Sequence, residues 1–190
     1  MEEMLLQDLS QRDWLGILNQ SLLTPALLPV LLVNNGVSVE RLTQLARMSL
    51  NLYEPYGRHI LYKSPEIEVM LAKWSYRSAA SPHNHGYSRG LIWFLKGDFN
   101  EQHFQFSKGQ LNAVGAPVYF AEGDVATVVS SDIHSCSPVG EGISLHLYSP
   151  AIQEMKVWDL ANKETLTVAD ECGAWVPQKS DLIIKRVKWE

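Results

Sequence analysis

The sequence has few cysteines, no long apolar run and no basic leader. Its two cysteines, Cys136 and Cys172, cannot form a disulfide framework, which is typical of a reducing, cytoplasmic compartment. The most apolar stretch, residues 22–33, is short and interrupted by Pro25 and Pro29, so we expect no membrane-spanning helix. The N-terminal Met-Glu-Glu-Met lacks the basic start of a secretion signal.

Positive charge is also scarce. The chain carries 16 Lys and Arg against 21 Asp and Glu, a formal net charge of −5, with no basic block. This distribution argues against a nucleic-acid partner and against binding to an anionic membrane. An apolar content of 46% over 190 residues is enough for one domain with a proper core. We therefore expect a single domain over residues 1–190.

The pattern of apolar residues divides that domain in two. Residues 1–50 follow a helical period, with Thr24-Pro25 and Ser38 as helix starts, and predict an N-terminal helical cap. Residues 51–190 contain short β-rich runs separated by Gly and Pro, without helices between them. The expected strands are 58–62, 67–74, 90–96, 99–106, 117–121, 125–130, 143–149, 155–159 and 183–188. This spacing predicts a mainly β, antiparallel sandwich or barrel.

Three histidines are candidate metal ligands. His83 and His85 stand two apart just before an apolar run, and residues i and i+2 of a strand share one face. Two imidazoles on one face can converge on a single metal ion. His134 follows the expected strand 125–130 and a turn, and could supply a third nitrogen. Taken alone, each could equally be an ordinary loop histidine.

The segment Ser144-Leu-His146-Leu-Tyr148 alternates between polar and apolar residues. Ser144, His146 and Tyr148 therefore share one face of a strand. One interpretation is an edge strand with its polar side in water. The other is a hydrogen-bonded relay in which Ser144 fixes the His146 tautomer and His146 orients the Tyr148 hydroxyl.

Tyr56 and Arg58 form another i, i+2 pair, at the entry to the first strand. An arginine that faces a barrel interior needs an anionic partner, and its planar fork suits a carboxylate. A solvent-facing Arg58 is the alternative. Of the remaining polar residues, Asp98 and Glu101 are expected to be solvated strand charges, and His59 and His103 ordinary surface or core histidines.

Together these motifs resemble the thiol dioxygenases of the cupin superfamily, specifically cysteine dioxygenases of the bacterial type. The resemblance covers roughly residues 50–160. It rests on Tyr56-x-Arg58, Trp74, Ser-Pro-His83-x-His85, Gly97, His134 and Ser144-Leu-His146-Leu-Tyr148-Ser-Pro150. It implies a cupin-type, jelly-roll-like barrel with an iron(II) ion on His83, His85 and His134.

One departure from the general cupin pattern supports this resemblance. Many cupins place a glutamate ligand four or five residues after the second histidine, where this chain has Arg89 and Gly90. Three neutral ligands would leave iron(II) its full charge and open positions for a thiolate and dioxygen.

The resemblance also implies an activity, the oxidation of L-cysteine by dioxygen to cysteine sulfinic acid. Arg58 would bind the substrate carboxylate, with Tyr56 supporting the same end of the pocket. Tyr148, oriented by His146 and Ser144, would hydrogen-bond the carboxylate or the reacting oxygen. The substrate thiol would bind iron as thiolate, its pKa lowered by the metal, and the amine would take a second position. The expected partners are a small thiol and dioxygen, and the expected state is a monomer.

Two details of the resemblance concern cysteine and proline. The animal enzymes have a cysteine that crosslinks to the tyrosine corresponding to Tyr148, and by spacing that position is Gly90 here. We therefore predict no thioether crosslink, and we expect Cys136 to be a plain loop cysteine. In the family, the peptide corresponding to Ser149-Pro150 is cis.

Other activities fit the same motifs. A relative selective for 3-mercaptopropionate typically has glutamine at the position of Arg58, so arginine favours cysteine. A three-histidine dioxygenase acting on a diketone would not need Arg58 or the Ser144-His146-Tyr148 face. A non-catalytic metal-binding cupin is a third possibility, although a structural zinc site usually has four protein ligands.

Overall fold

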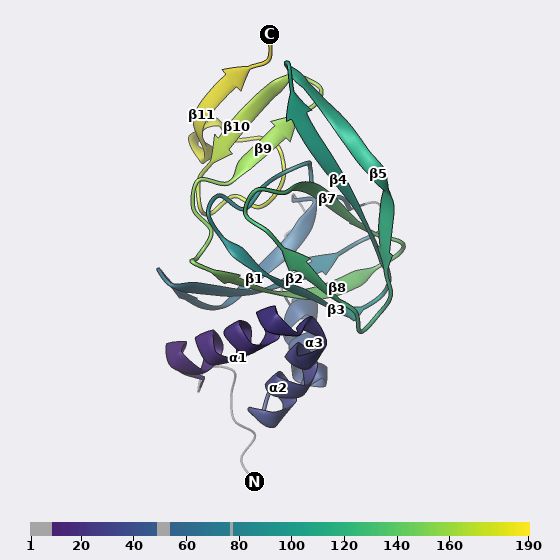
Figure 1. The fold of residues 1–190 in the computed structure, drawn as a ribbon, viewed down its shortest axis with the longest axis vertical. Helices are drawn as coiled ribbons and strands as arrows, with labels where there is room; N and C mark the ends of the chain where they lie inside the picture. The colour runs from purple at the N-terminus through teal and green to yellow at the C-terminus, as the bar shows by residue number, and fades with distance from the viewer. Residues whose placement is uncertain (1–8, 49–53, 77) are drawn as a thin grey trace.

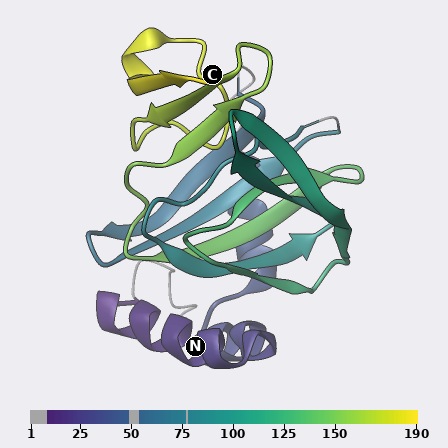
Figure 2. The ribbon, with the colours of Figure 1, turned by 45° about the horizontal axis from the view of Figure 1, so that its top comes forward.

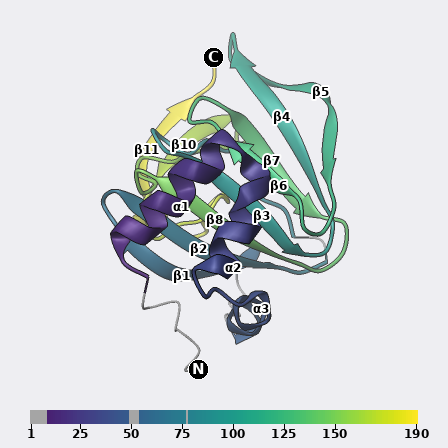
Figure 3. The same ribbon diagram turned by 60° about the horizontal axis from the view of Figure 1, so that its bottom comes forward.

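The computed structural model describes residues 9–48, 54–76 and 78–190; the ends of the expected helical cap, residues 1–8 and 49–50, lie outside these ranges. Three helices form the cap on one face of the molecule (Figures 1 and 3). They are α1 (Gln11–Leu23), α2 (Leu28–Asn34) and α3 (Val39–Met48), with a 3-10 turn, η2 (Pro25–Leu27), before α2. None of the described helices is both long and apolar enough to cross a membrane.

Local signals explain where the helices begin. Ser10 caps α1 through a capping box with Asp13, and Ser38 Oγ accepts a hydrogen bond from the Arg41 amide at the start of α3. Thr24 makes no side-chain cap; it precedes Pro25, which begins the 3-10 turn instead. Gly36, at φ 78°, ends α2 in the left-handed conformation that glycine adopts without strain.

A five-stranded antiparallel sheet packs against the cap, in the order β1-β2-β8-β3-β6 (Figure 1). Its strands are β1 (Tyr56–Ser64), β2 (Ile67–Trp74), β8 (Gly142–Ser149), β3 (Arg89–Lys96) and β6 (Val125–Val128). Both faces of its central strands are buried. Leu145 and Leu147 of β8 pack with the helical residues Trp14 and Leu18, whereas Tyr148 belongs to a second cluster inside the barrel. Alternate side chains of β8 therefore point to opposite sides, the leucines towards the cap and Tyr148 towards the barrel interior.

Two three-stranded antiparallel sheets complete the barrel (Figures 1 and 2). One has the order β5-β4-β7, with β4 (Phe99–Ser107), β5 (Gln110–Phe120) and β7 (Ile133–Pro138). The other has the order β11-β10-β9, with β9 (Lys156–Asp159), β10 (Glu164–Val168) and β11 (Ile183–Lys188), the last preceded by a 3-10 turn, η3 (Ser180–Leu182). The interior cluster joins all three sheets, since Phe99, Val157 and Leu166 pack with residues of the large sheet.

The prediction of a mainly β, antiparallel barrel with an N-terminal helical cap is confirmed. Three strands differ from expectation by more than two residues at an end or were not expected at all. β5 begins at Gln110 and continues through Gly115 and Pro117, which was possible because it is an edge strand and need not donate every amide hydrogen bond. β7 and β10 were not expected, since their sequences lack a clear apolar alternation.

Candidate metal centre

Three buried histidines meet inside the barrel. His83 and His85 lie in the segment that precedes β3, and His134 lies on β7, not in a loop. Two backbone hydrogen bonds join the segments: the His83 amide donates to the His134 carbonyl at 2.9 Å, and the His134 amide donates to the His83 carbonyl at 3.0 Å. One ligand nitrogen from each ring lies within 4.8 Å of the others. The residues expected as metal ligands are thus brought together.

The ring nitrogens are arranged as metal binding requires. His83 Nδ1 donates to the Ser81 carbonyl at 2.9 Å, which leaves Nε2 as its lone-pair nitrogen. His134 Nδ1 pairs with Glu101 Oε1, while His134 Nε2 is buried without a hydrogen-bond partner among the described residues, as is His85 Nδ1. Buried polar atoms are rarely left unpaired, so these nitrogens fit a metal ion.

Burial keeps the His83 and His85 rings neutral. Desolvation, followed by the charge of neighbouring histidines, holds the pKa of His83 and of His85 well below the ordinary value for imidazole. A neutral imidazole has a free lone pair, which is the form that binds a metal. These two rings can therefore bind a cation at neutral pH without first losing protons.

Glu101 is the partner of His134, and the expectation that it is a solvated charge is wrong. Its side chain is buried on β4, where one carboxylate oxygen pairs with His134 and the other lies 3.6 Å from Nε2 of the half-exposed His103. A carboxylate behind a ligand histidine fixes the ring and makes it a stronger donor. A sequence signal existed: Glu101 shares a strand face with the core residue Phe99.

The polar face of β8 forms a hydrogen-bonded chain inside the barrel. Trp74 Nε1 donates to Ser144 Oγ at 2.9 Å, Ser144 Oγ lies 2.7 Å from His146 Nε2, and His146 Nδ1 lies 2.8 Å from the Tyr148 hydroxyl. The alternative of a solvated edge strand is wrong, because β8 lies between β2 and β3. Trp74 joins the relay, a role that the sequence did not reveal.

The donor and the acceptor of each hydrogen bond in this series follow from its first donor, Trp74. An indole can only donate, so Ser144 accepts from Trp74, and the described partner left for its own proton is His146 Nε2. Burial lowers the pKa of His146 to about 3, so the ring is neutral and its Nδ1 carries the proton given to Tyr148. The hydroxyl proton of Tyr148 then remains available to the cavity.

Tyr148 lies beside the histidines and is tightly packed. Its ring stacks on His85 with centroids 5.0 Å apart, and burial raises its pKa well above the usual phenol value. Gly90 is paired directly with Tyr148, and a Cβ added there would come within 2.8 Å of the tyrosine ring. The position that the resemblance assigns to a crosslinking cysteine thus faces Tyr148, and it is a glycine in this chain. The Ser149–Pro150 peptide is cis, as the resemblance implies.

Arg58 reaches the same cavity from β1 but already has partners. Its Nε donates to Met70 Sδ at 3.2 Å, its Nη1 donates to the Glu171 carbonyl at 3.1 Å, and its Nη2 lies 3.5 Å from Glu68 Oε1. The arginine side chain is 16% exposed and that of Glu68 only 1%. Arg58 therefore faces the pocket in an ion pair, an arrangement that the sequence did not reveal.

Tyr56 supports the far wall of the cavity. Its ring stacks on Trp74 at 4.1 Å, and its hydroxyl accepts a hydrogen bond from the Ala174 amide at 3.0 Å. That bond fixes residues 169–174, the loop after β10. The sequence gave no motif in this part of the chain, yet Asp170 and Cys172 line the cavity.

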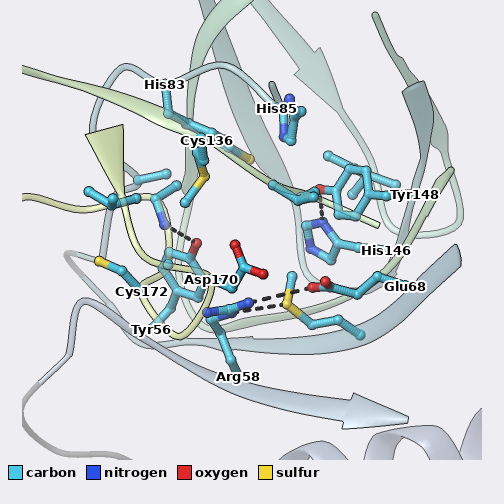
Figure 4. Close-up of a pocket in the computed structure, with 18 of the residues that line it drawn as sticks. Tyr56, Arg58, Glu68, His83, His85, Cys136, His146, Tyr148, Asp170 and Cys172 are labelled. Atoms are coloured by element: carbon cyan, nitrogen blue, oxygen red, sulfur yellow. Dashed lines mark hydrogen bonds and ion pairs between the residues drawn. The ribbon is translucent and has the colours of Figure 1, made fainter. Parts of the chain in front are cut away.

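These groups surround one small cavity, drawn in Figure 4. Its volume is about 40 Å³, a few times what one water molecule needs. His83 and His85 lie at one end of the cavity, with Tyr148 beside His85. At the other end lie Arg58, Glu68 and Asp170. Cys136 also lines the cavity, from β7 and not from a loop, and burial raises the pKa of its thiol far above the ordinary value.

The similarity of this chain to known proteins is distant. No protein-family model matches the sequence. Among solved structures, KdgF from Halomonas sp. aligns with 53% of this chain and 85% of its own, at 16% identity and a TM-score of 0.44. An uncharacterised conserved protein with a double-stranded β-helix domain from Klebsiella pneumoniae aligns with 59% of this chain and 92% of its own, at 12% identity and 0.49. An RmlC-like cupin from Shewanella frigidimarina aligns with 53% and 81%, at 18% identity and 0.44.

Proposed function

We propose that this protein is a non-haem iron(II) thiol dioxygenase that oxidises L-cysteine to cysteine sulfinic acid. The observation that carries the proposal is one cavity in which a three-histidine centre, the Tyr148 hydroxyl and Arg58 meet. The reaction balances without another reductant: both atoms of dioxygen bond to sulfur, which loses four electrons, and dioxygen gains four.

The metal would be held by His83, His85 and His134, whose free ring nitrogens fit that role. Iron(II) bound there would supply a Lewis acid that lowers the pKa of the substrate thiol and a redox centre for dioxygen. Three neutral ligands without a carboxylate favour this chemistry over a closed structural site.

The remaining residues bind and orient the substrate. Arg58 has N–H groups left over from its protein contacts, and these can hold a carboxylate. Tyr148 can donate its proton to the bound substrate, because His146 already donates to the tyrosine oxygen. The apolar walls, including Ile92, Met155 and Val168, limit the entry of water.

The test begins with metal-free protein loaded anaerobically with iron(II). L-Cysteine and dioxygen are then added, and oxygen uptake and sulfinate are measured together. We expect one sulfinate per dioxygen, and at least a 10-fold lower kcat/KM for Arg58→Gln, because a charge-assisted hydrogen bond to the carboxylate is lost. Exposed Arg12→Gln is the control.

The same assay separates the alternatives. Preferential turnover of 3-mercaptopropionate would support the iron chemistry and would show that this thiol, and not L-cysteine, is the substrate. Bound iron without oxygen uptake on any thiol would refute the dioxygenase, and would leave a non-catalytic metal-binding cupin.

A further inference from the structure

Three contacts hold the Arg58 guanidinium at the cavity, and they differ in kind. Its Nε donates to Met70 Sδ, which is a weak acceptor, and its Nη1 donates to the Glu171 carbonyl. Glu68, two residues before Met70 on β2, supplies the third contact, with Oε1 at 3.5 Å from Nη2. Among the residues that the structure describes, Glu68 alone forms an ion pair with Arg58.

The Glu68 carboxylate is itself fixed in place. Its side chain is 1% exposed, and its Oε2 lies 3.0 Å from Nζ of Lys63, the residue paired with it on β1. Lys63 approaches from the open side, since 38% of its side chain is exposed. Because the lysine holds one carboxylate oxygen, the other is left facing Arg58. Glu68 is therefore a fixed negative charge beside the guanidinium.

Arg58 also borders an outer groove that contains other acidic residues. The groove includes Glu54, Asp170 and Glu171, and the last two are exposed. Arginine has a long side chain with many rotamers, so a guanidinium without an anion on its inner side can turn towards these carboxylates. In Figure 4 the guanidinium instead points towards Glu68. The buried carboxylate thus favours the inward direction over the outward one.

We propose that Glu68 is a positioning residue that keeps the Arg58 guanidinium directed into the cavity, where its free N–H groups bind the carboxylate of the substrate. This inference rests on the proposed function, in which Arg58 binds that carboxylate, and it adds a residue that the resemblance did not imply. Glu68 acts through Arg58 and does not touch the substrate. Its own charge repels a carboxylate, but Lys63 offsets that charge from the other side.

The test compares two thiols that differ in the carboxylate. L-Cysteine and cysteamine share the thiol and the amine, but cysteamine has no carboxylate. Their affinities for the iron(II)-loaded protein are measured by anaerobic calorimetry, so that no turnover is needed. We expect Glu68→Gln to weaken binding of L-cysteine by about 10-fold, because Arg58 loses its fixed anion. Binding of cysteamine should be unchanged, and the control Glu66→Gln, an exposed charge in the turn before β2, should change neither affinity.

A double-mutant cycle shows whether Glu68 acts through Arg58. In the Arg58→Gln background, Glu68→Gln should cause no further loss of L-cysteine affinity, because the group that Glu68 positions is already absent. Additive losses would mean that Glu68 acts independently of Arg58, and would overturn the proposal. Glu68→Asp keeps the charge but withdraws it from Arg58, so it too should weaken L-cysteine and spare cysteamine. This variant carries the test if Glu68→Gln does not fold.

The outcomes separate this inference from the proposed function. Unchanged or tighter L-cysteine binding by Glu68→Gln, or equal weakening of both thiols, would overturn the positioning role, even if the wild type forms sulfinate. Selective weakening of L-cysteine, in a protein whose wild type binds thiols but forms no sulfinate, would support the positioning role and refute the dioxygenase. A wild type that does not bind L-cysteine would overturn both.

Discussion

The carboxylate of Glu101 lies directly behind the metal ligand His134, and both are buried. Glu101→Gln keeps an oxygen that can accept from His134 but removes the negative charge. We expect the affinity for iron(II) or zinc(II) to fall by about 10–100-fold, as for other partners of ligand histidines. Competition with a fluorescent chelator measures it.

The control for this change is Glu141→Gln, an exposed charge in the turn before β8. It should leave the metal affinity unchanged. Equal affinities for wild type and Glu101→Gln would show that the carboxylate only fills space behind the ring.

Ser144 is the residue on which the β8 relay depends. Ser144→Ala leaves both Trp74 Nε1 and His146 Nε2 without a described partner inside the barrel. Each unpaired buried group costs about 1–3 kcal/mol, so the free energy of unfolding should fall by a few kcal/mol. If the proposed activity holds, kcat should decrease more than KM changes, because Tyr148 loses its orientation.

Urea denaturation and steady-state kinetics measure the two effects. Ser137→Ala, a half-buried serine of β7, is the control and should have little effect on either. A stability loss without any change in kcat would limit the relay to a structural role.

The sequence revealed some of these residues and not others, for a physical reason. His83-x-His85 and Ser144-x-His146-x-Tyr148 are visible because their members stand two residues apart, the first pair in the segment before β3 and the second group on β8. Glu68 and Glu101 are single charges, and a lone charge on a strand is usually solvated. The face shared with Phe99 hints that Glu101 is buried, but the partners of the two carboxylates, Arg58 and His134, lie on other strands, and sequence spacing does not reveal them.

At the scale of elements, β8 has two buried faces with separate functions. Leu145 is fully buried against the helical cap, whereas its neighbour His146 lines the cavity and Ser144 is hydrogen-bonded to His146. Leu145→Ala should therefore lower the free energy of unfolding by about 2–5 kcal/mol. Because the leucine points away from the cavity, metal affinity at low temperature should be preserved.

Urea denaturation and metal titration test this separation. Leu160→Ala, at an exposed position after β9, should change stability by less than about 0.5 kcal/mol. A large loss of metal affinity in folded Leu145→Ala would contradict the division between the two faces.

The bounds of a strand were predicted more accurately where its sequence is a clear run of apolar or β-branched residues. β2 and β11 have the predicted bounds, and β3 and β8 begin one residue earlier, since each has a clear run of apolar or β-branched residues. β7 reads Ile-His-Ser-Cys-Ser-Pro, and its inward residues are His134 and Cys136. A strand that points functional side chains inward has no hydrophobic alternation to reveal it.

At the scale of the whole molecule, the metal centre connects parts of the chain that are far apart in sequence. His83 forms isolated bridges both to His134 on β7 and to Val157 on β9, so the centre lies where the two small sheets meet the segment before β3. A metal ion that binds the folded state alone stabilises the entire fold by mass action.

We therefore expect iron(II), added anaerobically, or zinc(II) to raise the melting temperature of the metal-free protein. At a free metal concentration 100 times Kd, the linkage relation gives about 2.7 kcal/mol of added stability. His85→Ala should remove this shift, because one of three ligands is lost, whereas exposed Tyr87→Ala should retain it. Differential scanning calorimetry across a metal titration measures the shift. A rise of equal size in His85→Ala would mean that the ion binds elsewhere, and the histidine triad would then not be the metal centre.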